Sequence, residues 1–185
     1  MTSDSHTRAL RRIGTLLLLV AYVCPCASAE AAAEIRTEAE VKAAFLFNFT
    51  KFVTWPPSAF EASNSPLSIC ILGDDPFGKM LDQLVDGEAV GGRKVVVDRL
   101  HGEPVPKACQ VVFVGKTERR AAVMEKFGPG VLTVGDGADF LRDGGMIAFV
   151  LDRGHVRFDI NQRAASQSDL SLSARLLNVA RSVQR

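Results

Sequence analysis

Short apolar runs bounded by glycine, proline and aspartate alternate along the chain with stretches whose apolar residues recur at helical spacing. Six of the apolar runs are predicted to be strands: residues 67–72, 94–97, 110–114, 131–134, 146–151 and 156–160. The helical spacing predicts helices over residues 34–53, 76–85, 117–127, 138–142 and 172–183. This alternation predicts an α/β fold with a mostly parallel sheet of about six strands, covered by helices on both faces. A tight turn at residues 153–154 predicts that the last two strands add an antiparallel edge hairpin.

The first predicted helix, over residues 34–53, has apolar residues on more than one of its faces. Thr37 and Glu40 have capping-box spacing at its start, and Trp55-Pro56-Pro57 ends it. Aromatic and aliphatic residues between 41 and 53 cover more than one side of the helix. We therefore expect this helix to be buried on several sides, either in the core or against a partner, and it is also a candidate for self-association.

Residues 1–29 have the three parts of a secretory signal peptide. Three arginines precede an apolar run at residues 13–23, and small residues at 27–29 supply a cleavage site. The run has eleven residues, about half of the roughly 20 that a membrane-spanning helix needs. The sequence therefore predicts cleavage before Glu30, which leaves residues 30–185 as a single exported domain.

Composition and charge exclude several function classes. The chain has 22 basic and 21 acidic side chains and a formal charge of +1, so no nucleic acid is expected as a partner. It has three histidines, His6, His101 and His155, and neither a metal nor a cofactor is expected. Neither G-x-S-x-G nor H-E-x-x-H occurs, and no catalytic residue is assigned. An enzyme is the weakest hypothesis.

Cys70 and Cys109 are the two cysteines that remain after the predicted cleavage. An even pair in an exported domain is typical of a disulfide. A bond that closes a loop of about 40 residues would stabilise the fold by roughly 4 kcal/mol. Two buried free thiols are the alternative.

Three glycine-containing loops follow predicted strands, at residues 73–75, 115–117 and 135–137. Open α/β sheets bind ligands at the carboxyl ends of their strands, so these loops support a small-ligand-binding module as a second hypothesis. Gly115-Lys116-Thr117 lacks the earlier glycine of a phosphate-binding loop. Asp74 and Asp75 could hold a cation, but we favour a simpler role as the cap of the next helix.

Polar residues also interrupt the first and the last predicted helix. Asn48 and Lys51 lie within the apolar first helix, and Arg175, Asn178 and Arg181 form a three-spaced line on the last one. They form either a solvated face or an anion or partner site that both helices build.

Several segments resemble the YfiR-like family of bacterial periplasmic proteins. The segments are VKAAFLFNFTKFVTWPPSAF (41–60), LSICILGDDPFG (67–78), GRKVVVDRL (92–100), CQVVFVG (109–115), GGMIAFVLDRGHVRFDIN (144–161) and LSLSARLLNVAR (170–181). The resemblance implies a three-layer α/β sandwich without enzymatic activity. It also implies a periplasmic repressor that binds the periplasmic domain of an inner-membrane diguanylate cyclase and so lowers cyclic-di-GMP and biofilm growth.

The resemblance implies a further partner, and the positions of the motifs suggest a candidate surface. A peptidoglycan-associated outer-membrane lipoprotein would sequester the repressor, and a second copy of the chain is another candidate partner. Cys70 and Cys109 match the family's cysteine pair, whereas the second pair of some members is missing here. We therefore favour a structural staple over a redox sensor. The candidate partner or ligand surface comprises Asn48, Phe49, Lys51, Trp55, Asp74, Asp75, Arg175 and Asn178.

Overall fold

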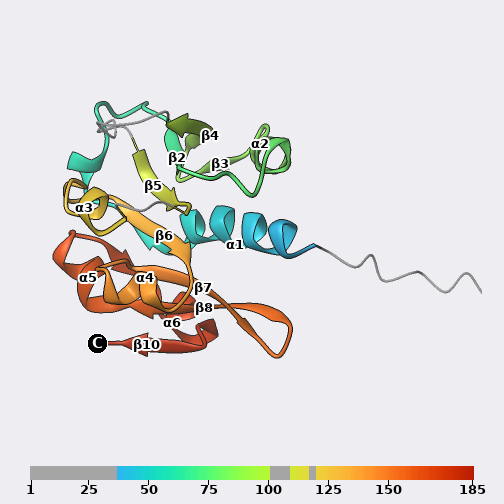
Figure 1. Ribbon diagram of the computed structural model, residues 1–185. Helices are drawn as coiled ribbons and strands as arrows, with labels where there is room; N and C mark the ends of the chain where they lie inside the picture. Colours follow the sequence, from blue (N-terminus) through green and yellow to red (C-terminus); the bar gives the residue numbers. More distant parts are fainter. Residues whose placement is uncertain (1–36, 101–108, 117–119) are drawn as a thin grey trace, which may run out of the picture. The chain divides into compact units, whose positions relative to one another are not determined.

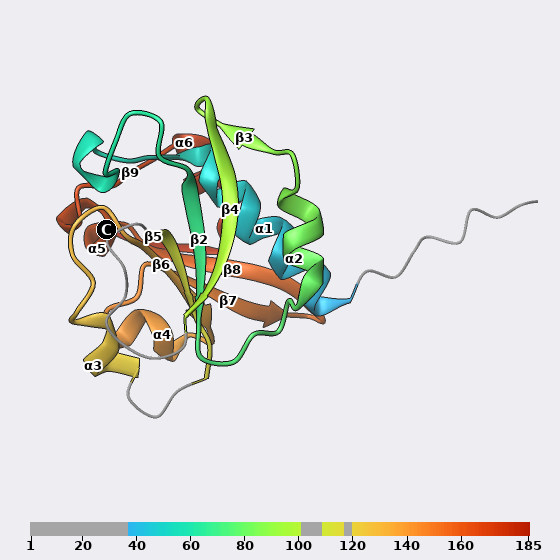
Figure 2. The same cartoon turned by 90° about the horizontal axis from the view of Figure 1, so that it is seen from above.

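The centre of the fold is a twisted sheet between two layers of helices (Figures 1 and 2). The computed structural model describes residues 37–100, 109–116 and 120–185. Eight strands form the sheet within these ranges, and their spatial order is β10 (Ser182–Gln184), β8 (His155–Asn161), β7 (Ile147–Asp152), β6 (Leu132–Asp136), β5 (Cys109–Val114), β2 (Leu67–Leu72), β4 (Arg93–Leu100) and β3 (Ala89–Val90). The five strands from β4 to β7 are parallel to one another.

The mostly parallel sheet and its antiparallel hairpins confirm the predicted fold class. All residues of β2 and β5 are buried, because helices cover both faces of a parallel sheet, and this explains why their sequences are apolar except for Ser68 and Gln110. β7 and β8 form the predicted hairpin. Arg153 and Gly154 have φ values of 51° and 79°, the geometry of a two-residue type I′ turn. β10 then adds one more strand beside β8, parallel to it.

The helices divide between the two faces of the sheet. Their bounds are α1 (Glu38–Phe52), α2 (Lys79–Val85), α3 (Arg120–Met124), α4 (Asp139–Arg142), α5 (Gln162–Gln167) and α6 (Ala174–Val179), with a 3-10 turn at Pro57–Ala59. Figure 2 shows α1 and α2 on one side of the sheet, and α3 and α4 on the other. A separate pair of short antiparallel strands, β1 (Val53–Thr54) and β9 (Ser171–Leu172), connects the end of α1 to the C-terminal region.

The larger apolar core lies under α1. Phe45 and Phe49 of α1 contact Phe149 of β7 and Phe158 of β8, with ring centroids 5.0–6.3 Å apart. These stacked and edge-on pairs supply attraction beyond the area that they bury. A second core on the other face of the sheet contains both cysteines. The prediction that α1 is buried on several sides therefore reflects its place in the core.

The capping box at the start of α1 is confirmed. The Thr37 hydroxyl accepts a hydrogen bond from the Glu40 amide, and the Glu40 carboxylate accepts one from the Thr37 amide. Thr37 is extended, so α1 begins at Glu38. The predicted start of this helix, at residue 34, lies outside the described residues. The cap thus positions the first turn of α1, which bears Glu38.

The single helix predicted over residues 172–183 is wrong, because this segment contains β9, α6 and β10. The Ser173 hydroxyl caps α6 by accepting from the Leu176 amide, and Ala180 is already extended. The Arg181 amide then donates to the carbonyl of Phe158, while its guanidinium binds both carboxylate oxygens of Asp159. Pairing of β10 with β8 therefore ends α6 after fewer than two turns.

Other predicted boundaries shift as well. α2 begins at Lys79 rather than at residue 76, and α3 ends at Met124 rather than at residue 127. The short helix α5 was not predicted at all. Several predictions concern segments outside the described residues. They are the signal peptide over 1–29 with its cleavage before Glu30, the helix start at residue 34, His101 and Thr117. None of the helices in the described ranges is long and apolar enough to span a membrane.

Candidate functional site

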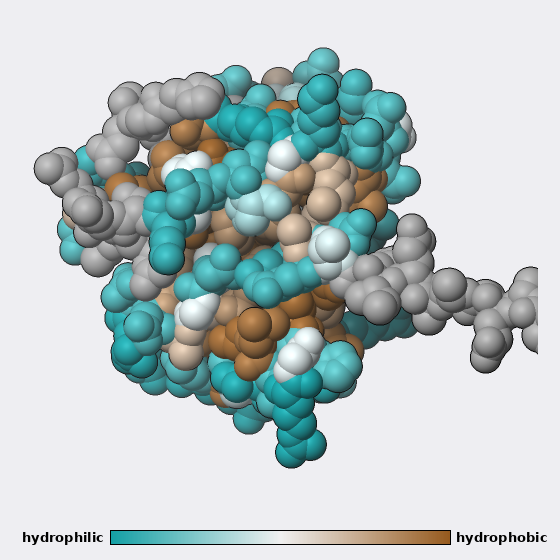
Figure 3. Space-filling view, turned by 45° about the vertical axis from the view of Figure 1, so that its right-hand side comes forward, coloured by the Kyte–Doolittle hydropathy of each residue, from teal (hydrophilic) through white to brown (hydrophobic). Residues whose placement is uncertain are grey.

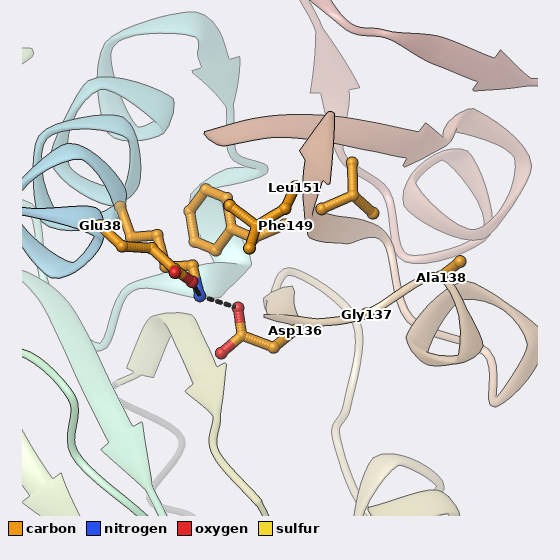
Figure 4. Close-up of a pocket in the computed structure, with 8 residues that line it drawn as sticks. Glu38, Asp136, Gly137, Ala138, Phe149 and Leu151 are labelled. Carbon is orange, nitrogen blue, oxygen red and sulfur yellow. Dashed lines mark ion pairs between the residues drawn. The ribbon is translucent and has the colours of Figure 1, made fainter. Parts of the chain in front are cut away.

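A pocket of about 490 Å³ opens where the first turn of α1 meets the carboxyl ends of β6 and β7 (Figure 4). Its lining residues are Glu38, Lys42, Asp136, Gly137, Ala138, Phe149, Val150 and Leu151. Of the three loops that the sequence predicted as ligand sites, the loop at residues 135–137 contributes to this pocket.

A lysine between two carboxylates forms the polar wall of the pocket. The Lys42 ammonium lies 2.6 Å from Glu38 Oε1 and 2.7 Å from Asp136 Oδ1. Glu38 and Lys42 are four residues apart on α1 and therefore share one face of the helix. Both carboxylates are about half exposed, whereas only 11% of the lysine side chain is accessible. Two carboxylates and one ammonium give this wall a net charge of −1.

The environment of Lys42 determines what the wall can do chemically. Burial lowers the pKa of Lys42, but hydrogen bonds to Asp136 and Glu38 outweigh it, so the pKa lies above its ordinary value. An ammonium that keeps its proton is neither a general base nor a nucleophile at neutral pH. The geometry therefore favours binding over catalysis.

Apolar residues of β7 form the opposite wall. Side chains alternate along a strand, so Phe149 and Leu151 project from the same face. Phe149 is buried under α1, whereas 59% of Leu151 is exposed, and Figure 4 shows both beside the carboxylates. Figure 3 shows apolar side chains gathered in a patch that polar side chains surround. A binding partner for this pocket must therefore bring apolar surface and a positive charge.

The two other predicted loops pack against each other at the residues that the structure describes, 73–75 and 115–116. The Gly115 amide donates to the Leu72 carbonyl over 2.8 Å. A Cβ atom on Gly115 would lie 2.3 Å from the Asp74 carbonyl oxygen, so only glycine permits this approach. Asp74 is exposed, and so is Lys116.

Asp75 holds the loop before α2 but does not cap the helix: the N-cap of α2 is Gly78, which has no side-chain cap hydrogen bond, so the predicted capping role is wrong. Asp75 Oδ1 accepts hydrogen bonds from the amides of Phe77 and Gly78, just before α2. Its Oδ2 accepts from Arg99 Nε, and the same guanidinium binds Asp82 of α2. The aspartate thus joins the start of α2 to β4, a structural role.

The polar residues predicted on the first and last helices are solvent-exposed. Asn48, Lys51, Arg175 and Asn178 are all exposed, and α6 packs against α1. The Lys51 ammonium lies 4.1 Å from the centroid of its neighbour Phe47's ring. Phe49 does not belong to any surface, because it is 1% exposed beneath α1, and this corrects its assignment to the candidate surface.

Trp55 lies near the amino end of β5, at the opposite end of the strands from Asp75. Its indole Nε1 donates to the carbonyl of Gln110, whose buried side-chain amide binds the backbone of Ser68 and Ala59. Gln110 is the second residue of β5, whereas Asp75 follows the carboxyl end of β2. A six-residue strand is about 20 Å long. The structure therefore does not bring all the predicted surface residues together.

The pocket's central residues were not predicted as a site. Glu38 and Lys42 have the i,i+4 spacing of a helical ion pair, which was the available signal. Asp136 was noted only within its loop. Leu151 ends an apolar run just before a turn, and no local pattern distinguishes an exposed apolar residue there from a buried one.

The disulfide between Cys70 and Cys109 is present, with Cα atoms 5.8 Å apart. It links adjacent strands, and both residues are at most 2% exposed. Across the described residues, His, Cys, Asp and Glu side chains nowhere gather in a group of three or more that could hold a metal ion.

Comparison with known protein families gives one match over most of the chain. The family model described as YfiR/HmsC-like matches residues 39–181. No curated protein matches the chain.

Proposed function

Because the chain belongs to the YfiR/HmsC-like family, we propose that it is a non-enzymatic periplasmic regulator that represses a membrane diguanylate cyclase. It does so by binding the periplasmic sensor domain of the cyclase. The observation that carries this proposal is the family match, which spans the fold from α1 to α6. The predicted signal peptide supports export, and the protonated, doubly paired Lys42 supports binding rather than catalysis at the pocket.

Repression of this kind is a population shift. A regulator moves a two-state cyclase only by its difference in affinity for the two states. Moving the sensor domain from 1% to 99% inactive requires a preference of about 10⁴-fold, or roughly 5.5 kcal/mol. A rigid surface suits this task, since little conformational entropy is lost on binding. The filled cores and the cross-strand disulfide provide such rigidity here.

A peptidoglycan-associated outer-membrane lipoprotein would act by competition. Repressor bound to the lipoprotein is subtracted from the pool that reaches the cyclase, so the sensor domain returns to its active state. The output is then higher cyclic-di-GMP and more biofilm.

Cyclic-di-GMP in a deletion strain tests the proposal. We expect the level to rise when the gene is deleted and to fall when the full chain is restored. Restoring residues 30–185 without the leader should not lower it, because the protein would stay on the wrong side of the membrane. Capture with the purified sensor domain of the cyclase then tests direct binding. An unchanged level under several growth conditions would refute the proposal and favour the small-ligand-binding module.

A further inference from the structure

The pocket between α1 and the ends of β6 and β7 has the size and lining of a small-molecule site. Its volume of about 490 Å³ falls within the usual range for ligand pockets, roughly 300–1,000 Å³. Apolar walls with a few convergent polar groups are also typical of such sites. We propose that this pocket binds a small organic amine. The ammonium binds the carboxylates of Glu38 and Asp136, and the apolar part of the amine packs on Leu151.

The charge of the polar wall selects a cation. Lys42 bonds to one oxygen of Glu38 and one of Asp136, and each carboxylate has a second oxygen that can accept from another donor. Both carboxylates are about half exposed, so a ligand can reach them from solvent. The three groups together carry a charge of −1, and one added ammonium brings this wall to neutrality.

The start of α1 does not offer the pocket an anion site. Free amides at a helix N-terminus commonly bind anions. Here the amide of Thr37 donates to the Glu40 carboxylate, and the amide of Glu40 donates to the Thr37 hydroxyl. The capping box thus uses these two donors within the chain, whereas the carboxylate of Glu38 lines the pocket. An incoming anion would meet this negative charge.

The apolar wall favours an organic amine over an inorganic cation. Leu151 is 59% exposed and Phe149 lines the pocket beside it, as Figure 4 shows. An apolar group on the ligand would remove Leu151 from water, which a hydrated metal ion would not do. Calcium also requires about six to eight oxygen ligands, and the two carboxylates here are already bonded to Lys42.

The acidic loop is held in place without a ligand. Asp136 pairs with Phe149 where β6 meets β7. The next amide, of Gly137, donates to the Phe149 carbonyl over 2.8 Å, and the Phe140 amide donates to the Gly137 carbonyl over 3.0 Å. The loop is therefore fixed on both sides of Gly137. Binding to such a preorganised site loses little conformational entropy.

The test is isothermal titration calorimetry on the chain purified from the periplasm, with phenethylamine as the probe. We expect a dissociation constant below about 1 mM that rises in high salt. Phenethyl alcohol lacks the positive charge, hydrocinnamate carries a negative one, and ethylamine lacks the ring. Each of the three should bind more weakly than phenethylamine, because each loses one of the two kinds of contact.

Substitutions in the two walls locate the binding. Asp136→Asn should weaken phenethylamine binding roughly fivefold, the upper end for a partly exposed charge pair, and a further Glu38→Gln should weaken it again. Leu151→Ser should weaken phenethylamine while it leaves ethylamine unchanged. The matched controls are Asp98→Asn, on the exposed side of β4, and Leu84→Ser, on the exposed surface of α2, and neither should change the affinity. Melting temperatures without ligand show that each variant is folded.

This site goes beyond the proposed function and can fail independently of it, because calorimetry on the purified chain involves no cyclase. Phenethylamine that does not bind at millimolar concentration overturns the proposal, and so does binding that Asp136→Asn and Leu151→Ser leave unchanged. Equal binding of hydrocinnamate would also overturn it. A chain that binds none of the amines but loses repression in cells through Asp136→Asn would assign the pocket to a macromolecular partner and overturn the small ligand.

Discussion

Removal of the Cys70–Cys109 disulfide should cost about 4 kcal/mol of unfolding free energy. The two cysteines are 39 residues apart, and the loss of loop-closure entropy for a ring of about 40 residues gives this value. The total free energy of unfolding of a typical domain is only about 5–15 kcal/mol. We therefore expect a Cys70→Ala/Cys109→Ala variant to remain folded in buffer but to unfold at a much lower urea concentration.

The assay is urea unfolding followed by tryptophan fluorescence. Trp55 is the only tryptophan, and it bonds to the carbonyl of Gln110, next to Cys109. The slope with urea should also rise slightly in the variant, because the unfolded chain without the crosslink exposes more surface. The reduced wild-type chain, held in reductant, is the control, since it lacks the bond but keeps every side chain.

The rate at which this disulfide is reduced distinguishes a structural staple from a redox sensor. Both residues are nearly inaccessible within the core, so a thiol can reach the sulfurs only when the sheet opens. Reduction by dithiothreitol should be slow in buffer and should accelerate steeply with urea. A loss below about 1 kcal/mol would refute the entropy argument, and fast reduction independent of urea would refute the staple.

Three further perturbations test the fold around the site. Gly115→Ala should lose about 1–3 kcal/mol, because its Cβ would overlap the backbone of the facing loop, while Gly128→Ala, whose Cβ meets nothing within 4 Å, should leave the urea midpoint unchanged. Burial raises the pKa of Asp159, but its hydrogen bonds, chiefly from Arg181, bring it below the ordinary value. The ion pair therefore stabilises the fold at pH values above the ordinary pKa of aspartate, and this stabilisation is lost as the pH falls. Arg181→Gln should flatten the decline of the urea midpoint with falling pH, and an equal decline in both proteins would contradict the pairing. Phe49→Glu should fail to fold by circular dichroism, because it buries an unpaired charge; a folded variant that loses only its partner would contradict this.

The core of the sheet was predictable because its strands are buried on both faces. Each of β2 and β5 is a mostly apolar run, with one polar residue in each. Few folds other than a covered parallel sheet accommodate such runs in alternation with helices. The capping box of α1 was also predictable, since Thr37 and Glu40 encode it locally. The turn at Arg153 and Gly154 is equally local. These elements depend on residues that are near one another in the sequence.

The C-terminal region was not predictable, because its conformation depends on distant residues. Leu172, Leu176 and Val183 repeat at near-helical spacing, and a helix over all of them is reasonable from the sequence alone. The observed arrangement, a short α6 followed by β10, is stabilised by strand pairing with β8 and by the ion pair between Arg181 and Asp159. Neither contribution is visible in the local pattern, and tertiary pairing overrides propensity here.

The pocket contains a kind of residue that the sequence could not single out. Asn48 and Lys51 are polar residues in an apolar helix and lie on its exposed side, and their part in a partner surface stays a prediction. A large exposed apolar residue is the more informative feature of a folded surface. Leu151 has this character because the first turn of α1 lies at Phe149, while Leu151, two residues further along β7, stays exposed. Its exposure is therefore a consequence of packing between segments that are more than 100 residues apart in the chain, and no local pattern records it.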